Sequence, residues 1–402
     1  MVKGLLTGVL ATLALGGYAV AQPPVPDTRK SQAAPSDSTV VERRLLEAVR
    51  RNPDSVEAHH ALAAFYVRQR NLAAAIPHLQ RAQAIDPSHY ASGYDLALAL
   101  LETGKLRESR AQIATMLGAR DSAELHNLLG NVEERAGNLL AAADQFQRAA
   151  HADPTEAHLF DWGNNLLQLR AFEEADQVFT AAIARHPQSA RLHVGLGIAH
   201  YSRGRYEDAI KSFSRAADLD PSDPRPYQFL GEMYGVAPSM SREITTRLAG
   251  FAKAHPRNAL AQFHYAMSLW KGEADAPADL RQVEALLRRA VTLDRKLAKA
   301  FLQLGTLLSD QQRYREAIVE LQHATRAEPD LAQAHYRLAQ AYQRTGQQEL
   351  AAKELEIFER LSGKTSRDDS HDADRSARVS EPMSDVALAL AGTLHVRLNR
   401  GL

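Results

Sequence analysis

Histidine is the residue type in this chain best suited to chemistry, because there are sixteen histidines and no cysteine. Imidazole nitrogens bind zinc and exchange protons near neutral pH. The lack of cysteine excludes disulfides, cysteine-ligated zinc, iron–sulfur clusters, thiol nucleophiles and a lipid-modified N-terminal cysteine. The candidate metal ligands are four well-separated histidines and two isolated pairs: His59, His126, His193 and His335, with His59-His60 and His371-Asp372.

No catalytic motif accompanies these histidines. The chain has no Gly-rich phosphate loop ending in Lys-Ser/Thr, no His-Glu-x-x-His and no Gly-x-Ser-x-Gly. Lys and Arg number 48, as do Asp and Glu, so there is no general positive charge to hold a nucleic acid. We therefore expect a protein that is not an enzyme, has no cofactor and has no nucleic-acid partner.

Residues 1–21 predict a cleavable export signal. Lys3 supplies a short positive region, the stretch from Gly4 to Tyr18 is apolar and uncharged, and the small residues ending at Ala21 suit signal peptidase. The alternative is a retained anchor, but the apolar run is shorter than the ~20 residues that a spanning helix needs. No later segment is apolar enough to span a membrane. We expect cleavage after Ala21 and an exported protein, periplasmic or secreted.

Beyond the signal, the chain must be organised by repeats. Residues 22–39 hold four prolines and no helical periodicity, which predicts a disordered linker. From Val40 onward, prolines recur after expected helix ends at intervals of 33–35 residues, with one interval of 39, if Asp121 and Arg295 fill two empty slots. These prolines are Pro53, Pro87, Pro154, Pro187, Pro221, Pro256 and Pro329.

The period defines nine units with a shared pattern of large and small residues. They begin at Val56, Tyr90, Ala123, Glu156, Ala190, Pro224, Ala259, Ala298 and Ala332. Position 7 is always large and apolar, position 8 is always Gly or Ala, and position 24 is always apolar. We interpret each unit as two antiparallel helices that approach closely between positions 8 and 20, with positions 7 and 24 filling the gap beside them. Glycines at four first-helix ends fit a left-handed cap: Gly104, Gly137, Gly204 and Gly346.

This pattern resembles the tetratricopeptide repeat family, whose unit is a helix–turn–helix of about 34 residues. The fifth unit carries the family's residues without a gap: Gly204, Tyr206, Ala209, Phe213, Ala216 and Pro221. The resemblance implies an all-α, right-handed solenoid of nine repeats over residues 56–363, of the kind found in exported bacterial proteins. The sixth and seventh units diverge most, with extra residues at Gly235–Ser241 and Lys271–Asp279.

The ends of the solenoid carry three further segments. Residues 40–55 resemble an isolated second helix and should cap the first unit. Residues 364–383 are polar and charged, which predicts a disordered linker. Residues 384–402 regain apolar spacing, and a docking helix, a strand and an unfolded tail all remain open for this short C-terminal segment.

The repeats separate the histidine candidates. His59, His126, His193 and His335 share position 4 of four different units. Neighbouring helices pack on the order of 10 Å apart, whereas zinc needs nitrogens at about 2.0–2.1 Å. We therefore predict no metal site, and structural or solvated roles for these histidines.

The resemblance also implies a binding site. In the family the first helices line a concave surface, into which positions 2, 5, 9, 12 and 13 point. Asn131 and Asn164 repeat at position 9, and an amide both donates to and accepts from an extended backbone. The alternative is that the apolar residues at these positions only fill the core. The predicted groove residues are Tyr94, Leu98, Asn127, Asn131, Phe160, Asn164, Leu167, Arg191, Ile198, Tyr201, Phe263, Met267, Trp270 and Tyr336.

The carboxylate clamp of chaperone-binding relatives is incomplete here. Asn131 and Arg191 fit it, but Asn127, Asp161 and Gly195 stand where a lysine, a second asparagine and a cation are expected. We expect no recognition of a free C-terminal carboxylate.

These patterns favour an exported, non-catalytic scaffold that binds an extended protein or peptide segment. The first alternative is a structural accessory of an envelope assembly or of a polysaccharide or protein export complex, docked through Phe263, Met267 and Trp270. The second is a regulatory domain whose enzyme partner is a separate chain. Trp162 is expected in the core and Trp270 in the groove.

Overall fold

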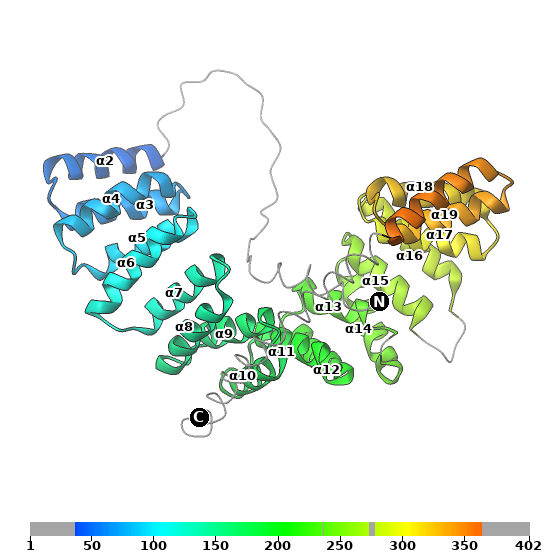
Figure 1. Cartoon of the computed structure of the whole chain (residues 1–402), viewed down its shortest axis with the longest axis horizontal. Coiled ribbons are helices and arrows are strands. Elements are labelled where there is room, and N and C mark those ends of the chain that lie inside the picture. The colour runs from blue at the N-terminus through cyan, green and yellow to red at the C-terminus, as the bar shows by residue number, and fades with distance from the viewer. Residues whose placement is uncertain (1–36, 236, 273–277, 364–402) are drawn as a thin grey trace, which may run out of the picture. The chain divides into compact units, whose positions relative to one another are not determined.

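The computed structural model describes residues 37–235, 237–272 and 278–363 (Figure 1). This described part is helical, with turns between the helices and no strand, so the all-α prediction is confirmed. The predicted signal peptide, most of the linker that follows it, and both C-terminal segments lie outside the described residues. No helix among the described residues combines the length and the apolarity needed to cross a membrane.

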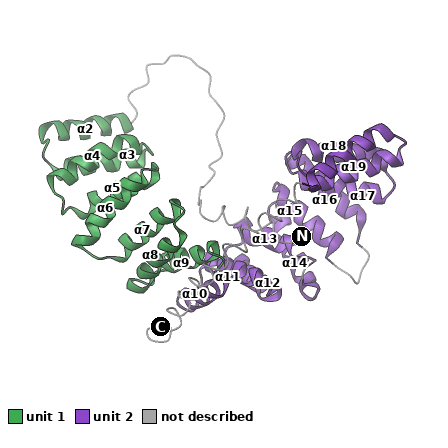
Figure 2. Ribbon diagram, in the orientation of Figure 1, with its two compact units in different colours: residues 1–170 green, residues 171–402 purple. Residues whose placement is uncertain are grey.

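The chain divides into two compact units, one ending at Arg170 and the other beginning at Ala171 (Figure 2). Consecutive helices of the first unit pack side by side as a stack of antiparallel pairs. They are α2 (Asp37–Arg51), α3 (Val56–Arg68), α4 (Leu72–Ile85), α5 (Tyr90–Glu102), α6 (Leu106–Ala119), α7 (Ala123–Arg135), α8 (Leu139–Ala152) and α9 (Glu156–Gln168).

The second unit shows the same pattern of antiparallel helices, with a short 3-10 turn, η1, between the two helices of the sixth repeat. A final described helical stretch covers residues 348–363. The elements are α10 (Phe172–Arg185), α11 (Ala190–Ser202), α12 (Tyr206–Leu219), α13 (Pro224–Glu232), η1 (Pro238–Met240), α14 (Ser241–Ala254), α15 (Ala259–Lys271), α16 (Leu280–Leu293), α17 (Ala298–Asp310), α18 (Tyr314–Ala327) and α19 (Ala332–Arg344).

The first helices begin at the nine residues from which the sequence repeats were counted, Val56 to Ala332. One boundary differs, because α2 already begins at Asp37 and so includes three residues assigned to the linker. Asp, Ser and Thr, which follow the last proline of that segment, are common at helix N-termini. α2 packs against α3, and the Tyr66 hydroxyl donates to Glu42 Oε1 at 2.9 Å.

The close approach of the paired helices occurs at position 8. The Ser109 hydroxyl, at position 20, donates to the carbonyl oxygen of Ala97, at position 8, over 2.7 Å. A Cβ added to Gly130 would lie 2.6 Å from the ring of Phe146, a residue at position 24. The position 24 side chain therefore lies directly over position 8, and not beside it as the sequence suggested. Glycine has no side chain, so a buried ring fits against its backbone.

The left-handed turn after the first helix is present with and without glycine. Gly104, Gly137, Gly204 and Gly346 have φ angles of 76°, 81°, 74° and 80°. The same place in three other repeats is held by Arg70, Arg170 and Gln312, with φ angles of 56°, 60° and 63°. A left-handed backbone costs a residue with a Cβ roughly 1–2 kcal/mol. These three turns are therefore strained positions that the sequence pattern did not reveal.

The sixth repeat departs from this geometry. Its first helix, α13, has 9 residues, whereas α11 and α15 have 13. The chain then passes through η1 before α14 begins. As a result α13 packs against both α14 and α15, and the space above Gly231, at position 8, is filled by the His264 ring of α15.

Candidate functional site

The predicted groove residues of the first unit lie on the first helices α5, α7 and α9. Leu98 is 38% exposed, and Tyr94, Asn127 and Asn131 are half-buried. Three others are buried: Phe160, Asn164 and Leu167. A buried side chain has no surface for a partner, so for these three the structure supports the alternative interpretation, in which they fill the core.

The second unit divides its predicted residues in the same way. Tyr336 is 38% exposed, while Arg191, Tyr201 and Trp270 are half-buried. The buried ones are Ile198, Phe263 and Met267. The last two belong to a hydrophobic cluster shared with α16 and α17. Adjacent first helices approach closely enough to cover these positions, which spacing along one helix does not reveal.

Asn127 and Asn131, the two half-buried asparagines of α7, form hydrogen bonds within the chain. Asn127 Nδ2 donates to Asp161 Oδ2 of α9 at 2.8 Å. Asn131 Nδ2 donates to the Asn127 carbonyl oxygen at 3.0 Å. Each amide group therefore already donates within the chain, and among the described residues the carbonyl oxygen of the Asn131 side chain accepts no hydrogen bond.

Polar side chains also bridge neighbouring first helices. Gln168 Nε2 of α9 donates to Glu134 Oε1 of α7 at 2.5 Å. Arg135 of α7 donates to the Leu101 carbonyl oxygen of α5 at 3.1 Å, and it pairs with Glu102 at 2.7 Å. These bridges join residues 33 or 34 positions apart, the repeat length.

Glu134 is a residue of this face that the sequence analysis missed. It is half-buried, and burial, followed by the negative charge of Asp161, raises its pKa above the ordinary glutamate value. Burial also raises the pKa of Tyr94, with further contributions from Tyr90, Glu124 and Asp95. Glu134 stands at position 12 of its repeat, which is one of the five positions that point into the groove in this family, so its place in the repeat could have indicated it.

Three of the four position 4 histidines, all but His193, make structural hydrogen bonds on both ring nitrogens. His335 Nδ1 lies 2.6 Å from Glu354 Oε2, and its Nε2 lies 2.9 Å from the Pro329 carbonyl oxygen. His126 and His59 likewise connect the preceding turn to the second helix of their own repeat. Across the described residues no three His, Asp or Glu side chains are grouped to hold a metal ion.

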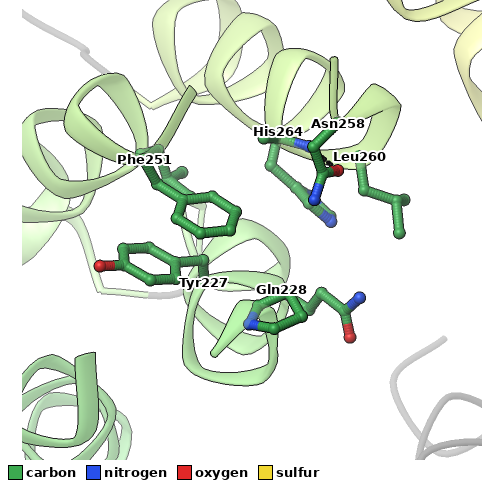
Figure 3. Close-up of a pocket in the computed structure, with 9 residues that line it drawn as sticks. Tyr227, Gln228, Phe251, Asn258, Leu260 and His264 are labelled. Atoms are coloured by element: carbon green, nitrogen blue, oxygen red, sulfur yellow. Dashed lines mark hydrogen bonds between the residues drawn. The ribbon is translucent and has the colours of Figure 1, made fainter. Parts of the chain in front are cut away.

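A small, shallow pocket that is open to solvent lies between the irregular sixth repeat and the seventh (Figure 3). The rings of Tyr227 and Phe251 stack on one side, 3.9 Å apart, while Gln228, Leu260 and His264 lie around the other. Burial lowers the pKa of His264, and its Nδ1 has no hydrogen-bond partner in the described part of the chain. The pocket is a consequence of the short α13.

Comparison with known families agrees with the fold and the repeat geometry. Two models of the tetratricopeptide repeat match residues 66–132 and 160–224. The chain is a tetratricopeptide repeat protein. A third model, described as a bacterial transcriptional activator domain, matches residues 241–369 of this repeat protein. No curated protein sequence matches this chain.

Solved structures of repeat proteins resemble this one. Yeast Tom70 is 15% identical, with 86% of this chain and 87% of that chain covered at a TM-score of 0.45. A tetratricopeptide repeat protein from Parabacteroides merdae ATCC 43184 is 16% identical, with coverages of 63% and 98% and a TM-score of 0.43. YrrB, a tetratricopeptide repeat protein with an unusual peptide-binding site, is 19% identical, with coverages of 46% and 96% and a TM-score of 0.38.

Proposed function

We propose that this protein is an exported, non-catalytic adaptor that binds an extended segment of another protein on the first-helix faces of its repeats. The tetratricopeptide fold supports a role as a protein–protein interaction scaffold. The observation that carries the finer proposal is that Leu98 on α5 and Tyr336 on α19, at positions 9 and 5 of their repeats, are exposed at positions that line the concave surface in this family. Exposed apolar and aromatic side chains are suitable anchors for a partner.

Export rests on the first 21 residues. The positive residue, the apolar stretch and the small residues before Gln22 have the order of a secretory signal. N-terminal sequencing of the protein purified from its native host tests this point. We expect Gln22 as the first residue, in a periplasmic or secreted protein, and an intact Met1 would contradict export by signal cleavage.

The alternative is an accessory of an envelope assembly or of a polysaccharide or protein export complex. Of its three docking residues, Phe263 and Met267 are buried, and Trp270 is half-buried with the Lys271 ammonium 4.4 Å from its ring centre. An adaptor should retain many clients on purification from envelope extracts, whereas an accessory should retain one stable complex.

Co-purification with matched variants tests the adaptor function. Leu98→Ser removes an exposed apolar side chain from a first helix, and Val319→Ser removes one, 50% exposed, from the second helix α18. We expect Leu98→Ser to lose clients that the wild type and Val319→Ser retain. Equal retention by all three proteins would contradict binding on this face.

A further inference from the structure

Four polar side chains meet where the first helices of the third and fourth repeats adjoin. Asn131 and Glu134 lie one turn apart on α7, and Asn165 and Gln168 lie one turn apart on α9, so each pair shares a helix face. The 2.5 Å hydrogen bond from Gln168 Nε2 to Glu134 Oε1 brings the two pairs together. Both helices belong to the same compact unit.

The carboxylate in this group lacks a positive partner. Arg135, which follows Glu134, pairs with Glu102, and Arg110 pairs with Glu133 at 2.6 Å. Among the described residues Glu134 forms no ion pair, and Gln168 supplies it with a neutral donor only. Removing a carboxylate from water without a counter-ion is costly. The raised pKa of Glu134, caused first by burial, has the direction expected of such a group.

A buried amide behind the carboxylate is also unsatisfied. Asn165 is completely buried, and neither its Nδ2 nor its Oδ1 makes a hydrogen bond of ordinary geometry within the described chain. Its amide nevertheless lies close enough to Glu134 to lower that residue's pKa. Buried polar atoms without partners are rare in folded proteins. Position 10 is apolar in most other repeats, including Val132 and Leu307, so an amide here is exceptional.

The spare bonding capacity at this place is mainly that of acceptors. The second oxygen of Glu134 and the side-chain oxygen of Asn131 accept no hydrogen bond within the described residues, and the buried side-chain oxygen of Asn165 beneath them is also without one. A lysine ammonium offers three donors and an arginine guanidinium five, each with a positive charge. Hydrogen bonds between such groups and a carboxylate are about twice as strong as neutral ones.

We propose that Glu134, with the neighbouring Asn131 and Gln168, forms a site, here called the Glu134 site, that binds a lysine or arginine side chain of the bound protein segment, while the buried Asn165 lies beneath it. This inference rests on the proposed function, and it adds the chemistry of the partner: an extended segment with a basic residue opposite the third and fourth repeats.

Fluorescent hexa-arginine and hexa-lysine peptides are the probes. Fluorescent hexa-glutamate, which has the opposite charge, is the control peptide. Binding to the full chain is measured by anisotropy at low ionic strength, where screening is weak. Glu134→Gln removes the charge and keeps the shape. Glu108→Gln removes one charge from an exposed place on α6 and is the matched control. We expect Glu134→Gln to weaken binding of the basic peptides about tenfold or more, and Glu108→Gln to change it less than twofold.

Equal weakening by the two variants would overturn the Glu134 site, and so would a wild-type protein that binds hexa-glutamate as well as hexa-arginine. Thermal unfolding provides a second readout. Because the pKa of Glu134 is raised in the folded state, its ionised form opposes folding, and its contribution to stability falls as pH rises through the unfolded value. Glu134→Gln should therefore melt at the same or a higher temperature at pH 7, and a clearly lower melting temperature would contradict an unpaired carboxylate.

The outcome for the Glu134 site is separable from the outcome for the adaptor function. Loss of clients in Leu98→Ser together with unchanged peptide binding in Glu134→Gln would refute the Glu134 site and leave the adaptor function in place. Retention of every client by Leu98→Ser would contradict the adaptor function itself.

Discussion

The contact between position 8 and position 24 gives the sharpest test of the repeat packing. In Gly197→Ala the added Cβ would lie 2.6 Å from Phe213 Cε1 and 2.7 Å from Cδ1. Ordinary carbon–carbon contacts are about 3.5–4.0 Å. The Phe213 ring is fully buried, so it cannot move aside without disturbing its neighbours.

Two opposing terms determine the magnitude. Alanine is better than glycine in a helix interior by about 0.8–1.0 kcal/mol. Inserting a methyl group into a close-packed core costs typically 1–3 kcal/mol, and a required shift of nearly 1 Å for a buried ring places this site at the upper end. We expect a net loss of about 2 kcal/mol.

Gly250→Ala is the matched control, because Gly250 lies inside α14 and a Cβ there meets nothing within 4 Å. This variant should gain about 0.5–1 kcal/mol from helix propensity alone. Urea unfolding followed by circular dichroism measures both free energies, since a change in the midpoint at constant slope reports stability. Both substitutions replace a helical glycine with alanine. A decrease in the free energy of unfolding for one and an increase for the other would therefore isolate the contribution of packing.

Phe213→Leu, alone and combined with Gly197→Ala, completes a double-mutant cycle. In the chain, alanine at position 8 occurs with leucine or isoleucine at position 24, as in Ala97 and Ile113. The double variant should therefore be less destabilised than the sum of the single ones. Strict additivity, or a Gly197→Ala protein as stable as Gly250→Ala, would refute the packing.

Three further predictions concern single sites. Gln312→Gly should stabilise the protein by roughly 1 kcal/mol in urea unfolding, because the residue has a φ of 63°; destabilisation would contradict a strained turn. Trp162 is buried, so Trp162→Ala should cost about 3–5 kcal/mol, whereas Trp270→Ala should reduce client capture with a smaller loss of stability; equal losses would contradict this difference. Burial and the charge of His59 lower the pKa of His78, so the unfolded state binds more protons and stability should fall as pH drops through about 6.5. His78→Gln should reduce that fall, measured as melting temperature against pH, and an unchanged profile would contradict it.

The repeat geometry was readable from the sequence because it depends on local chemistry. A small residue at position 8, such as Gly130, and a large one at position 24, such as Phe146, recur with the period, and prolines mark the ends of second helices. Only the structure shows that the two positions face each other directly. The turn at Gln312 was not readable, because its left-handed backbone is imposed by the neighbouring helices without glycine. The predictable part of the geometry is therefore the part that is determined within a single repeat.

The candidate site was less predictable, because it depends on how closely neighbouring first helices approach. Asn164 and Asn131 hold the same position in successive repeats, yet the first is buried and the second half-buried. The bond between Glu134 and Gln168 joins residues 34 positions apart. Position in the repeat gives the direction of a side chain, but only the packed structure gives its accessibility.

Site-specific photocrosslinking tests the central claim, that partners bind on the first-helix faces. A photoreactive amino acid is placed at Leu98, on the first helix α5, or at Val319, on the second helix α18, in the full chain. After irradiation in envelope extracts, mass spectrometry measures the yield of crosslinked partner peptides. We predict abundant crosslinked peptides from extended partner segments at Leu98 and few at Val319. Equal yields at the two sites, or crosslinks at Val319 alone, would contradict it.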